Sequence, residues 1–279
     1  MRSCQRVSGV MRDGNDGGEW EIMDRNASGI MDDLTCLERD EKFRFACGPE
    51  TPCFNRCCAQ LNLPLTPYDT LRLARNLGMP ASGFLRAFTG MRAEEATGFP
   101  MFHLRMIESP EAPCPFVSPA GCSVYEDRPA ACRCYPLGRG TRLGREGVVE
   151  RFFLVSEPHC RGFDSGRSWT AGEWLASQGL EEYNRFNDAY MRLLSLVAAG
   201  ERPIEPRLRS MAILSLWQPD QFRDFLRKMD IFSKLEPGRH DPAIIDEDSV
   251  AGDKACLAFG LDWLELVIFG RCSGLGRRR

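Results

Sequence analysis

The chain has 279 residues, of which 43% are hydrophobic and 27% are charged, and its formal net charge at pH 7 is only -3. This balance allows a sizeable buried core and excludes a disordered or collagen-like chain. The small net charge also argues against a protein whose whole surface binds nucleic acid. At roughly 150 residues per domain, the length allows one large domain or two small ones.

Residues 1–40 are predicted to form a poorly structured leader. The stretch 13–19 is rich in Gly and Asp, and residues 1–30 contain no apolar run of the length an export signal needs. Met23 and Met31 are alternative starting residues. We therefore expect a cytoplasmic protein with reduced cysteines, and in that setting clustered cysteines indicate a metal or catalysis.

Residues 41–165 are predicted to form a small α+β half in which loops carry the cysteines. A capping-box pattern of Thr66 and Asp69, with Pro67 at the first helical position, predicts a helix that ends at Gly78. The other elements expected here are a short helix from Ser82, a strand within residues 99–107, and a hairpin made of the Gly- and Arg-rich stretch 138–147 and the strand 148–155.

Residues 166–270 are predicted to be mainly helical and to pack on the first half, which makes the fold class α+β. Thr170 and Glu173 form a second capping box, and apolar residues later recur at helical spacing in three stretches, 183–197, 222–229 and 257–268. The most apolar segment, 255–270, is short for a membrane span and carries two acidic residues. Residues 271–279 are expected to be a flexible basic tail.

The most informative feature is the distribution of the 13 cysteines, nine of which lie between Cys47 and Cys160. They form the groups Cys47-x5-Cys53-x3-Cys57-Cys58 and Cys114-x7-Cys122-x9-Cys132-x-Cys134, followed by Cys160. Thiolates select zinc, iron–sulfur clusters or Cu(I), and both a closed zinc site and a cubane cluster take four ligands. Neither group is a complete metal motif, so we expect the two to converge in space.

Iron–sulfur is favoured over zinc because the chain has only three histidines and no Cys-x2-Cys pair typical of zinc ribbons. His159 could act as a ligand, although a solvated or hydrogen-bonded role is preferred for it. The Cys-x3-Cys-x2-Cys spacing of radical enzymes begins at Cys53 and Cys57, but Gln60 occupies the third position. No Walker A loop or HExxH motif occurs.

The segments FACGPETPCFNRCC, LTPYDTLRLARNLG, CPF and GCSVYEDRPAACRCYP resemble the YkgJ family of cysteine-cluster proteins over about residues 43–163. The resemblance implies chelation of zinc or iron by eight cysteines, namely Cys47, Cys53, Cys57, Cys58, Cys114, Cys122, Cys132 and Cys160. Cys134 stands at a variable position of the family's CRxYP element and is expected to be an extra. The family is similar to the flagellin lysine N-methylases, which combine a cysteine cluster with S-adenosylmethionine.

Three further residues of the resembling segment, Tyr125, Arg128 and Arg133, are candidate cofactor-binding residues that would donate to cluster sulfurs. The alternative for this stretch is a turn pinned by an Arg–Asp pair and by Pro129. The arginines of the 138–147 stretch have no interleaved aromatic residues, so a nucleic-acid partner is not expected.

The sequence therefore predicts a cytoplasmic protein that binds a metal through clustered cysteines, with a [4Fe–4S] cluster favoured and zinc as the alternative. An S-adenosylmethionine-dependent methylase of protein lysines and a zinc-stapled interaction module are the alternative functions, and whether the protein is an enzyme is left open. A metal ion or cluster is the expected partner, and no membrane partner is expected.

Overall fold

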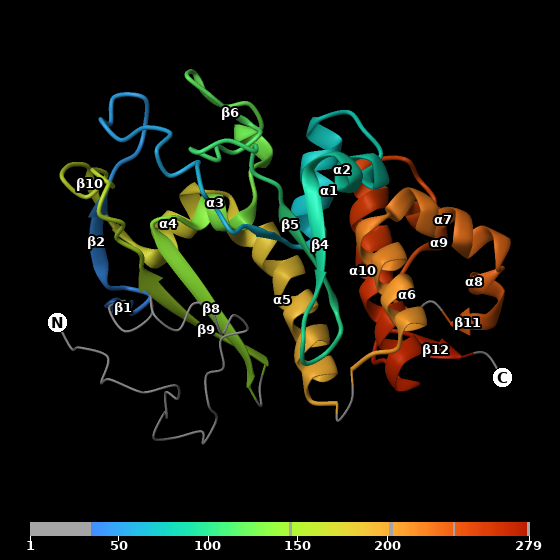
Figure 1. Cartoon of the computed structure of the whole chain (residues 1–279). Coiled ribbons are helices and arrows are strands. Elements are labelled where there is room, and N and C mark those ends of the chain that lie inside the picture. Colours follow the sequence, from blue (N-terminus) through green and yellow to red (C-terminus); the bar gives the residue numbers. More distant parts are fainter. Residues whose placement is uncertain (1–34, 145–146, 201–202, 237, 278–279) are drawn as a thin grey trace. The chain divides into compact units, whose positions relative to one another are not determined.

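The computed structural model describes residues 35–144, 147–200, 203–236 and 238–277 (Figure 1). The chain divides into two compact units that interleave along the sequence. Of the described residues, the first unit contains 35–58, 118–121 and 130–192, and the second contains 59–117, 122–129 and 193–277. Most of the predicted leader and the last two residues of the predicted tail lie outside the described residues, and the domain boundaries expected from the sequence stay predictions.

The first unit is built on small antiparallel sheets and three helices. One sheet has the order β1-β9-β8, with β1 (Thr35–Leu37), β8 (Leu137–Gly144) and β9 (Gly147–Leu154). A second sheet pairs β2 (Lys42–Phe45) with β10 (Arg167–Thr170). The helices are α3 (Ala130–Cys134), α4 (Ala171–Ser177) and α5 (Leu180–Ala198), of which α5 runs on into the second unit after Arg192.

The predicted hairpin is confirmed as the β8–β9 pair, the long green and yellow ribbon of Figure 1. The Arg139 side chain on β8 fixes it, because its Nε donates to Glu150 on β9 at 2.9 Å and its guanidinium pairs with Asp188 of α5 at 2.7 Å. β1 pairs with the other edge of β9, so residues 35–37 of the expected leader are a strand.

An aromatic cluster forms the core of the first unit. The Trp174 ring of α4 packs edge-on against Phe45 of β2 at 5.5 Å and against Trp169 of β10 at 5.1 Å between centroids. Such edge-to-face pairs add to the stabilisation that burial alone provides. Thr170 and Glu173 form the predicted capping box at the start of α4.

The second unit combines a three-stranded antiparallel sheet with helices. The sheet has the order β3-β5-β4, with β3 (Pro64–Leu65), β4 (Thr89–Ala93) and β5 (Pro100–Leu104), and β5 confirms the strand expected within 99–107. Helix α1 (Pro67–Asn76) has the predicted Thr66–Asp69 capping box, and α2 (Ala81–Phe88) begins one residue earlier than predicted.

Five helices and two short strands complete the second unit after α5. They are α6 (Pro206–Trp217), α7 (Pro219–Lys228), α8 (Ile231–Lys234), β11 (Leu235–Glu236), α9 (Pro242–Ile245), α10 (Val250–Phe269) and β12 (Gly276–Arg277). Helix α6 was not expected from the sequence, whereas α7 and α10 match predicted helical stretches. Gly260 lets α10 approach α6 closely, because a Cβ there would lie 2.3 Å from the Ser215 carbonyl oxygen. β12 pairs with β11, so part of the expected tail is a strand.

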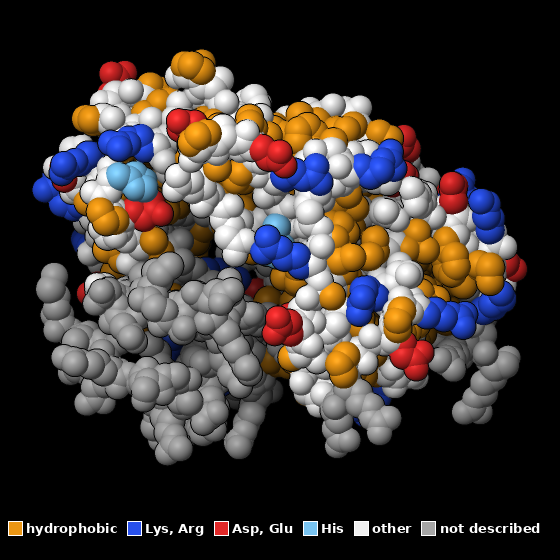
Figure 2. Space-filling model, viewed as in Figure 1, with side chains coloured by type: hydrophobic (Ala, Val, Ile, Leu, Met, Phe, Trp, Pro, Cys, Tyr) orange, Lys and Arg blue, Asp and Glu red, His pale blue; other side chains and the backbone are white. Residues whose placement is uncertain are grey.

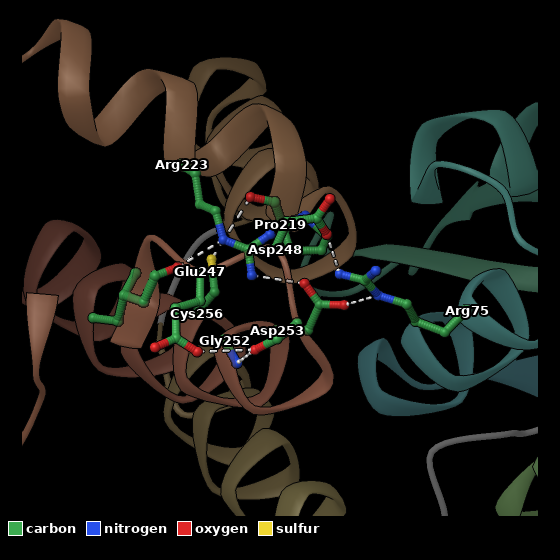
Figure 3. Close-up of polar contacts among 10 residues, drawn as sticks. Arg75, Pro219, Arg223, Glu247, Asp248, Gly252, Asp253 and Cys256 are labelled. Atoms are coloured by element: carbon green, nitrogen blue, oxygen red, sulfur yellow. Dashed lines mark hydrogen bonds and ion pairs between the residues drawn. The ribbon is translucent and has the colours of Figure 1, made fainter. Parts of the chain in front are cut away.

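Helix α10 is held at its N-terminal end by a partly buried ion-pair network (Figure 3). Asp253 of α10 accepts hydrogen bonds from Arg223 of α7 and from Arg75 of α1, and Arg75 also pairs with Asp248. The helices and small antiparallel sheets of the two units confirm the α+β class. Within the described ranges, no helix has both the length and the apolar character that crossing a membrane requires.

Candidate metal centre

Four of the cysteines implied by the resemblance line one small cavity of the first unit. They are Cys47, Cys53, Cys57 and Cys160, and the cavity also contacts Phe45, Tyr135, His159 and Gly162. We call this the cysteine cavity. Its cysteines come from the segment after β2 and from the segment between β9 and β10, which are about 100 residues apart in the sequence. The first unit also contains Cys58 and Cys132.

Glycines allow the two segments of the cysteine cavity to meet. A Cβ on Gly162 would lie 2.4 Å from the Phe45 ring, and one on Gly166, whose φ is +102°, would lie 2.6 Å from the Phe45 carbonyl. The Ala46 N–H donates to the Gly162 carbonyl at 2.9 Å, and the Trp169 indole donates to the Phe45 carbonyl at 2.9 Å. Larger residues at Gly162 and Gly166 would push the segments apart.

The first cysteine group lies on consecutive turns, as the interruption by Gly and two Pro predicts. Backbone hydrogen bonds run from Thr51 N–H to the Gly48 carbonyl at 2.9 Å and from Cys58 N–H to the Asn55 carbonyl at 3.0 Å. Asn55 has a φ of +68°, which Asn tolerates better than most side chains. The turns bring both Cys53 and Cys57 into the lining of the cysteine cavity.

The thiols of the cysteine cavity differ in electrostatic environment. The Cys57 pKa is lowered to about 7, chiefly by a hydrogen bond from the Cys58 side chain, while burial and the Glu157 carboxylate oppose this shift. Cys53 is 8% exposed, and its Sγ accepts a hydrogen bond from the Arg161 backbone N–H at 3.1 Å. Because the thiolate is the metal-binding form, this environment favours metal binding at Cys57.

Three polar atoms near these sulfurs are buried without a hydrogen-bond partner, although their side chains are only partly buried. The Tyr135 hydroxyl has no hydrogen-bond partner, and it lies beside Cys160. Burial, together with that thiol, raises the Tyr135 pKa. His159 Nε2 and Glu157 Oε2 lie 3.3 Å apart without forming a hydrogen bond. Orphaned buried polar atoms require an explanation, and a bound ion is one. The donor set of sulfurs and one imidazole therefore fits zinc or iron chemically.

The four cysteines line one cavity, but their sulfurs do not form the coordination sphere of a metal. Across the part of the chain that the structure describes, no three Cys, His, Asp or Glu side chains are arranged to hold a metal ion. The eight implied cysteines are thiols, whereas Cys36 of β1 is disulfide-bonded and departs from the expectation that all cysteines are reduced. Metal ligation by these residues therefore stays a prediction.

The remaining cysteines of the two groups have separate environments. Cys114 and Cys122 belong to the second unit, where burial and then the neighbouring Cys122 thiol raise the Cys114 pKa. Cys114 precedes β6 (Val117–Ser118), and Cys122 ends β7 (Gly121–Cys122). The expected convergence of these two sulfurs with the first group stays a prediction. Cys134 is a core residue whose pKa is raised to about 12 by burial, and its expected exclusion from the ligand set stays a prediction.

The three candidate cofactor-binding residues make contacts of another kind. Arg128 stacks on the exposed Tyr125 ring at 3.8 Å and donates to the Tyr125 carbonyl at 2.7 Å, next to the 3-10 turn η3 (Tyr125–Asp127). The Arg133 guanidinium lies 4.9 Å from the Tyr183 ring centroid and donates to the Gln178 carbonyl at 2.7 Å. Asp127 of the same turn accepts a hydrogen bond from Arg72 of α1 at 2.7 Å. A role for Tyr125, Arg128 and Arg133 towards a cluster stays a prediction.

The charged surface shows alternation of sign. On the face seen in Figure 2, Lys and Arg side chains are interspersed with Asp and Glu over the described residues. Arg139 of the hairpin is committed to carboxylates within the protein. The expectation that the protein has no nucleic-acid partner stays a prediction.

A comparison with protein families gives the site its context. The model of the CxxCxxCC family, described as "Putative zinc- or iron-chelating domain", matches residues 46–161. The domain spans all eight implied cysteines, which confirms the expected cysteine-cluster family and supports metal binding. No curated protein and no solved structure matched the chain.

Sequence reasoning missed Tyr135, which lines the cysteine cavity, and Glu157, which acts on it electrostatically, and it gave His159 little weight as a ligand. Tyr135 follows the second cysteine group directly in the CRCYP run, and this adjacency was its only signal. Glu157, which influences Cys57 and Tyr135, has no signal beyond its closeness to Cys160. His159, for which a solvated or hydrogen-bonded role was preferred, is 33% exposed, lies 3.3 Å from Glu157 and lines the cavity.

Proposed function

We propose that this protein binds a metal in the cytoplasm through the thiolates of Cys47, Cys53, Cys57 and Cys160. The observation that carries the proposal is the cysteine cavity, because sulfurs from two segments far apart in the sequence line this one cavity. Cysteines that serve only as small hydrophobic core residues would be expected to pack against apolar side chains. Here they lie beside buried polar atoms that lack hydrogen-bond partners. Thiolates grouped in this way match the zinc- or iron-chelating description of the domain.

An iron–sulfur cluster, of the [4Fe–4S] type, is the metal group that we propose first. Four thiolates are the usual ligand number of that cluster, and the cysteine cavity offers four. The Cys53 contact with the Arg161 amide is of the kind that tunes cluster sulfurs. Cys58, Cys114, Cys122 and Cys132 are proposed as the remaining ligands, for the same or a second metal group.

Zinc is the second candidate, and one observation favours it. His159 lines the cavity, and its buried Nε2 has no hydrogen-bond partner, although Glu157 Oε2 lies 3.3 Å from it. A Cys3His set is a common structural zinc site, and it would use this nitrogen in place of one sulfur. This site would staple the two segments of the cavity and need not take part in redox chemistry.

Anaerobic purification of the full chain, followed by metal and sulfide analysis, tests the proposal. Iron with a similar amount of acid-labile sulfide, and a brown colour, is the expected result. A colourless protein with stoichiometric zinc would overturn the iron–sulfur assignment and support the second candidate. A protein that holds neither metal, and that takes up neither on reconstitution, would refute metal binding at these cysteines.

A further inference from the structure

The Cys53 sulfur lies next to the backbone of Cys160, although the two residues belong to different segments of the chain. The Arg161 backbone N–H donates to Cys53 Sγ at 3.1 Å, and this nitrogen is bonded to the carbonyl carbon of Cys160. In a trans peptide the nitrogen lies about 2.4 Å from the preceding Cα, so Cys53 Sγ is at most about 5.5 Å from the Cys160 Cα. The Cys53 sulfur is therefore within reach of a sulfur carried on that Cα.

Both residues also line the cysteine cavity, which is small. Its volume is about 10 Å³, which leaves room for one water molecule at most. Tyr135 lines the cavity as well, and its hydroxyl lies beside the Cys160 thiol. Cys53 and Cys160 are both free. They are therefore a pair of thiols that share a cavity no larger than a water molecule.

Backbone contacts hold the two segments together on either side of this pair. The Ala46 N–H donates to the Gly162 carbonyl at 2.9 Å, and the Arg161 N–H donates to Cys53 Sγ. A disulfide needs its two Cα atoms at a restricted separation, and cysteines held farther apart can be joined only if the backbone moves. Because the backbone is already held here, we expect rotation of the two side chains to be sufficient.

The two thiols differ in their access to solvent. Cys53 is 8% exposed, whereas Cys160 is only partly buried, so a dissolved oxidant meets Cys160 first. Of the other thiols in the cavity, Cys57 accepts a hydrogen bond from the Cys58 side chain, and Cys47 is exposed. The Cys53 sulfur, by contrast, contacts the peptide group that follows Cys160. These contacts single out Cys53 as the thiol that reacts with an oxidised Cys160.

We propose that hydrogen peroxide converts Cys53 and Cys160 into a reversible disulfide that closes the cysteine cavity to metal ions. In the first step the Cys160 sulfur attacks the peroxide, so that an S–O bond forms, the O–O bond breaks and a water molecule leaves. In the second step the Cys53 sulfur attacks the resulting sulfenic acid, so that an S–S bond forms, the S–O bond breaks and a second water leaves. The two sulfurs are oxidised and the peroxide is reduced to water.

A small-molecule dithiol reverses the change and is itself oxidised to a disulfide. The bond between Cys53 and Cys160 forms without any metal, but its effect concerns one. A sulfur in a disulfide cannot act as a thiolate ligand, so the oxidised cavity offers a metal two sulfurs fewer. This effect rests on the metal site proposed above.

Peptide mapping of the full chain tests the pairing. The protein is reduced, freed of metal with a chelator, and treated with stoichiometric hydrogen peroxide. Its remaining thiols are then blocked with N-ethylmaleimide before digestion with trypsin. Trypsin cuts after arginine, so Cys53 is carried on residues 45–56 and Cys160 on residues 152–161. We expect mass spectrometry to find these two peptides joined, with the loss of two hydrogens, and to find them separate after treatment with dithiothreitol.

Two variants and one condition identify the partner of Cys160. Cys47→Ser is the matched control, because Cys47 and Cys53 lie on the same tryptic peptide. The link should persist in Cys47→Ser and disappear from Cys53→Ser. Oxidation of the parent protein in urea should lower the yield of the link to that of other cysteine pairs, because only the folded chain brings the two segments together. This comparison holds even if Cys53→Ser does not fold.

Three results would overturn the pairing. They are a link that survives in Cys53→Ser, a link from the Cys160 peptide to residues 57–72, which carry Cys57 and Cys58, and oxidation that yields only sulfinic acid or linked dimers. A yield of the link in urea that equals the yield in the folded protein would also overturn it.

Zinc uptake tests the closure of the cavity. The oxidised protein should lose most of its zinc uptake, and reduction with dithiothreitol, followed by removal of the reagent, should restore it. Equal uptake by the oxidised and the reduced protein would overturn the closure. A reduced protein that takes up neither zinc nor iron would instead refute the proposed function, while the peptide link, measured without metal, would still decide whether the disulfide forms.

Discussion

The backbone N–H of Arg161 donates a hydrogen bond to Cys53 Sγ at 3.1 Å, although the two residues are 108 positions apart. This contact joins the loop of the first cysteine group to the segment that carries Cys160. Because the donor is an amide of the main chain, no substitution of the Arg161 side chain removes it, other than by proline. This hydrogen bond forms only when the two segments are folded against each other, so the position of Cys53 in the cavity depends on the fold of the first unit.

Replacement of cavity cysteines should reduce both metal content and stability. In Cys57→Ser and Cys160→Ser we expect loss of most of the metal, and a Tm lower by roughly 5–10 °C, because binding free energy of the metal is also folding free energy. Metal analysis and thermal unfolding measure the two effects. Cys122→Ser is predicted to act in the same way, which tests whether the second unit contributes ligands.

Cys272→Ser is the matched control for these variants, since Cys272 lies outside the domain matched at residues 46–161. It should keep both metal content and Tm. Unaltered metal content in Cys57→Ser and Cys160→Ser would contradict the site.

Tyr135→Phe should change the properties of the metal centre more than the stability of the fold. The hydroxyl is buried beside Cys160, so its removal takes a potential donor from one ligand sulfur. For an iron–sulfur centre we expect a lower reduction potential, and for either metal a faster loss to a chelator. Tyr190→Phe, at a buried tyrosine of α5, is the control that removes a hydroxyl away from the cavity. Equal potentials and chelation rates in the two variants would refute this role.

The Asp253 carboxylate should be a main determinant of stability in the second unit. Its side chain is 4% exposed and pairs with the buried Arg223, so Asp253→Ala leaves a buried cation without its partner (Figure 3). We expect a loss of about 3 kcal/mol in the free energy of unfolding, measured with urea. Asp248 is 87% exposed and pairs with Arg75, which also pairs with Asp253. Asp248→Ala should therefore lower the free energy of unfolding by less than about 1 kcal/mol. Similar losses in both variants would contradict the assignment.

The Asp262 carboxylate should make the second unit sensitive to acid. Burial raises its pKa, but the hydrogen bond with His240 and the Arg239 cation outweigh this effect, and the pKa lies below its ordinary value. A lowered pKa in the folded state stabilises the fold above the unfolded pKa, and the contribution is lost as the pH falls below about 4. Asp262→Asn, which cannot titrate, should lose less stability than the parent between about pH 4 and pH 2.5. Urea midpoints that fall in parallel for both proteins would show that other groups dominate.

Removal of residues 1–30 should leave the fold and the metal content unchanged. The sequence there shows no apolar periodicity, and the truncated chain keeps β1, which pairs with β9. Circular dichroism and metal analysis of the shortened protein measure the outcome. An insoluble or metal-free product would show that these residues are needed.

The sequence by itself determined the elements whose signals are local. Thr66 with Asp69 and Thr170 with Glu173 start helices because a side chain and a backbone N–H three residues apart satisfy each other, whatever surrounds them. The β8–β9 hairpin is local in the same sense. The cysteine spacing, likewise, was enough to indicate the chelating domain that the family comparison confirms.

Only the tertiary structure decided which residues share the cysteine cavity. Phe45 and Gly162 can meet only because residue 162 has no side chain, since a Cβ there would clash with the Phe45 ring. Tyr135 and His159 line the same cavity, although no sequence spacing indicates this. The β1–β9 and β2–β10 pairs are also long-range, and strands of three or four residues have too weak a pattern to reveal their partners. Contacts between distant segments form because the whole unit buries its aromatic core, so they are properties of the packed chain and not of any window of sequence.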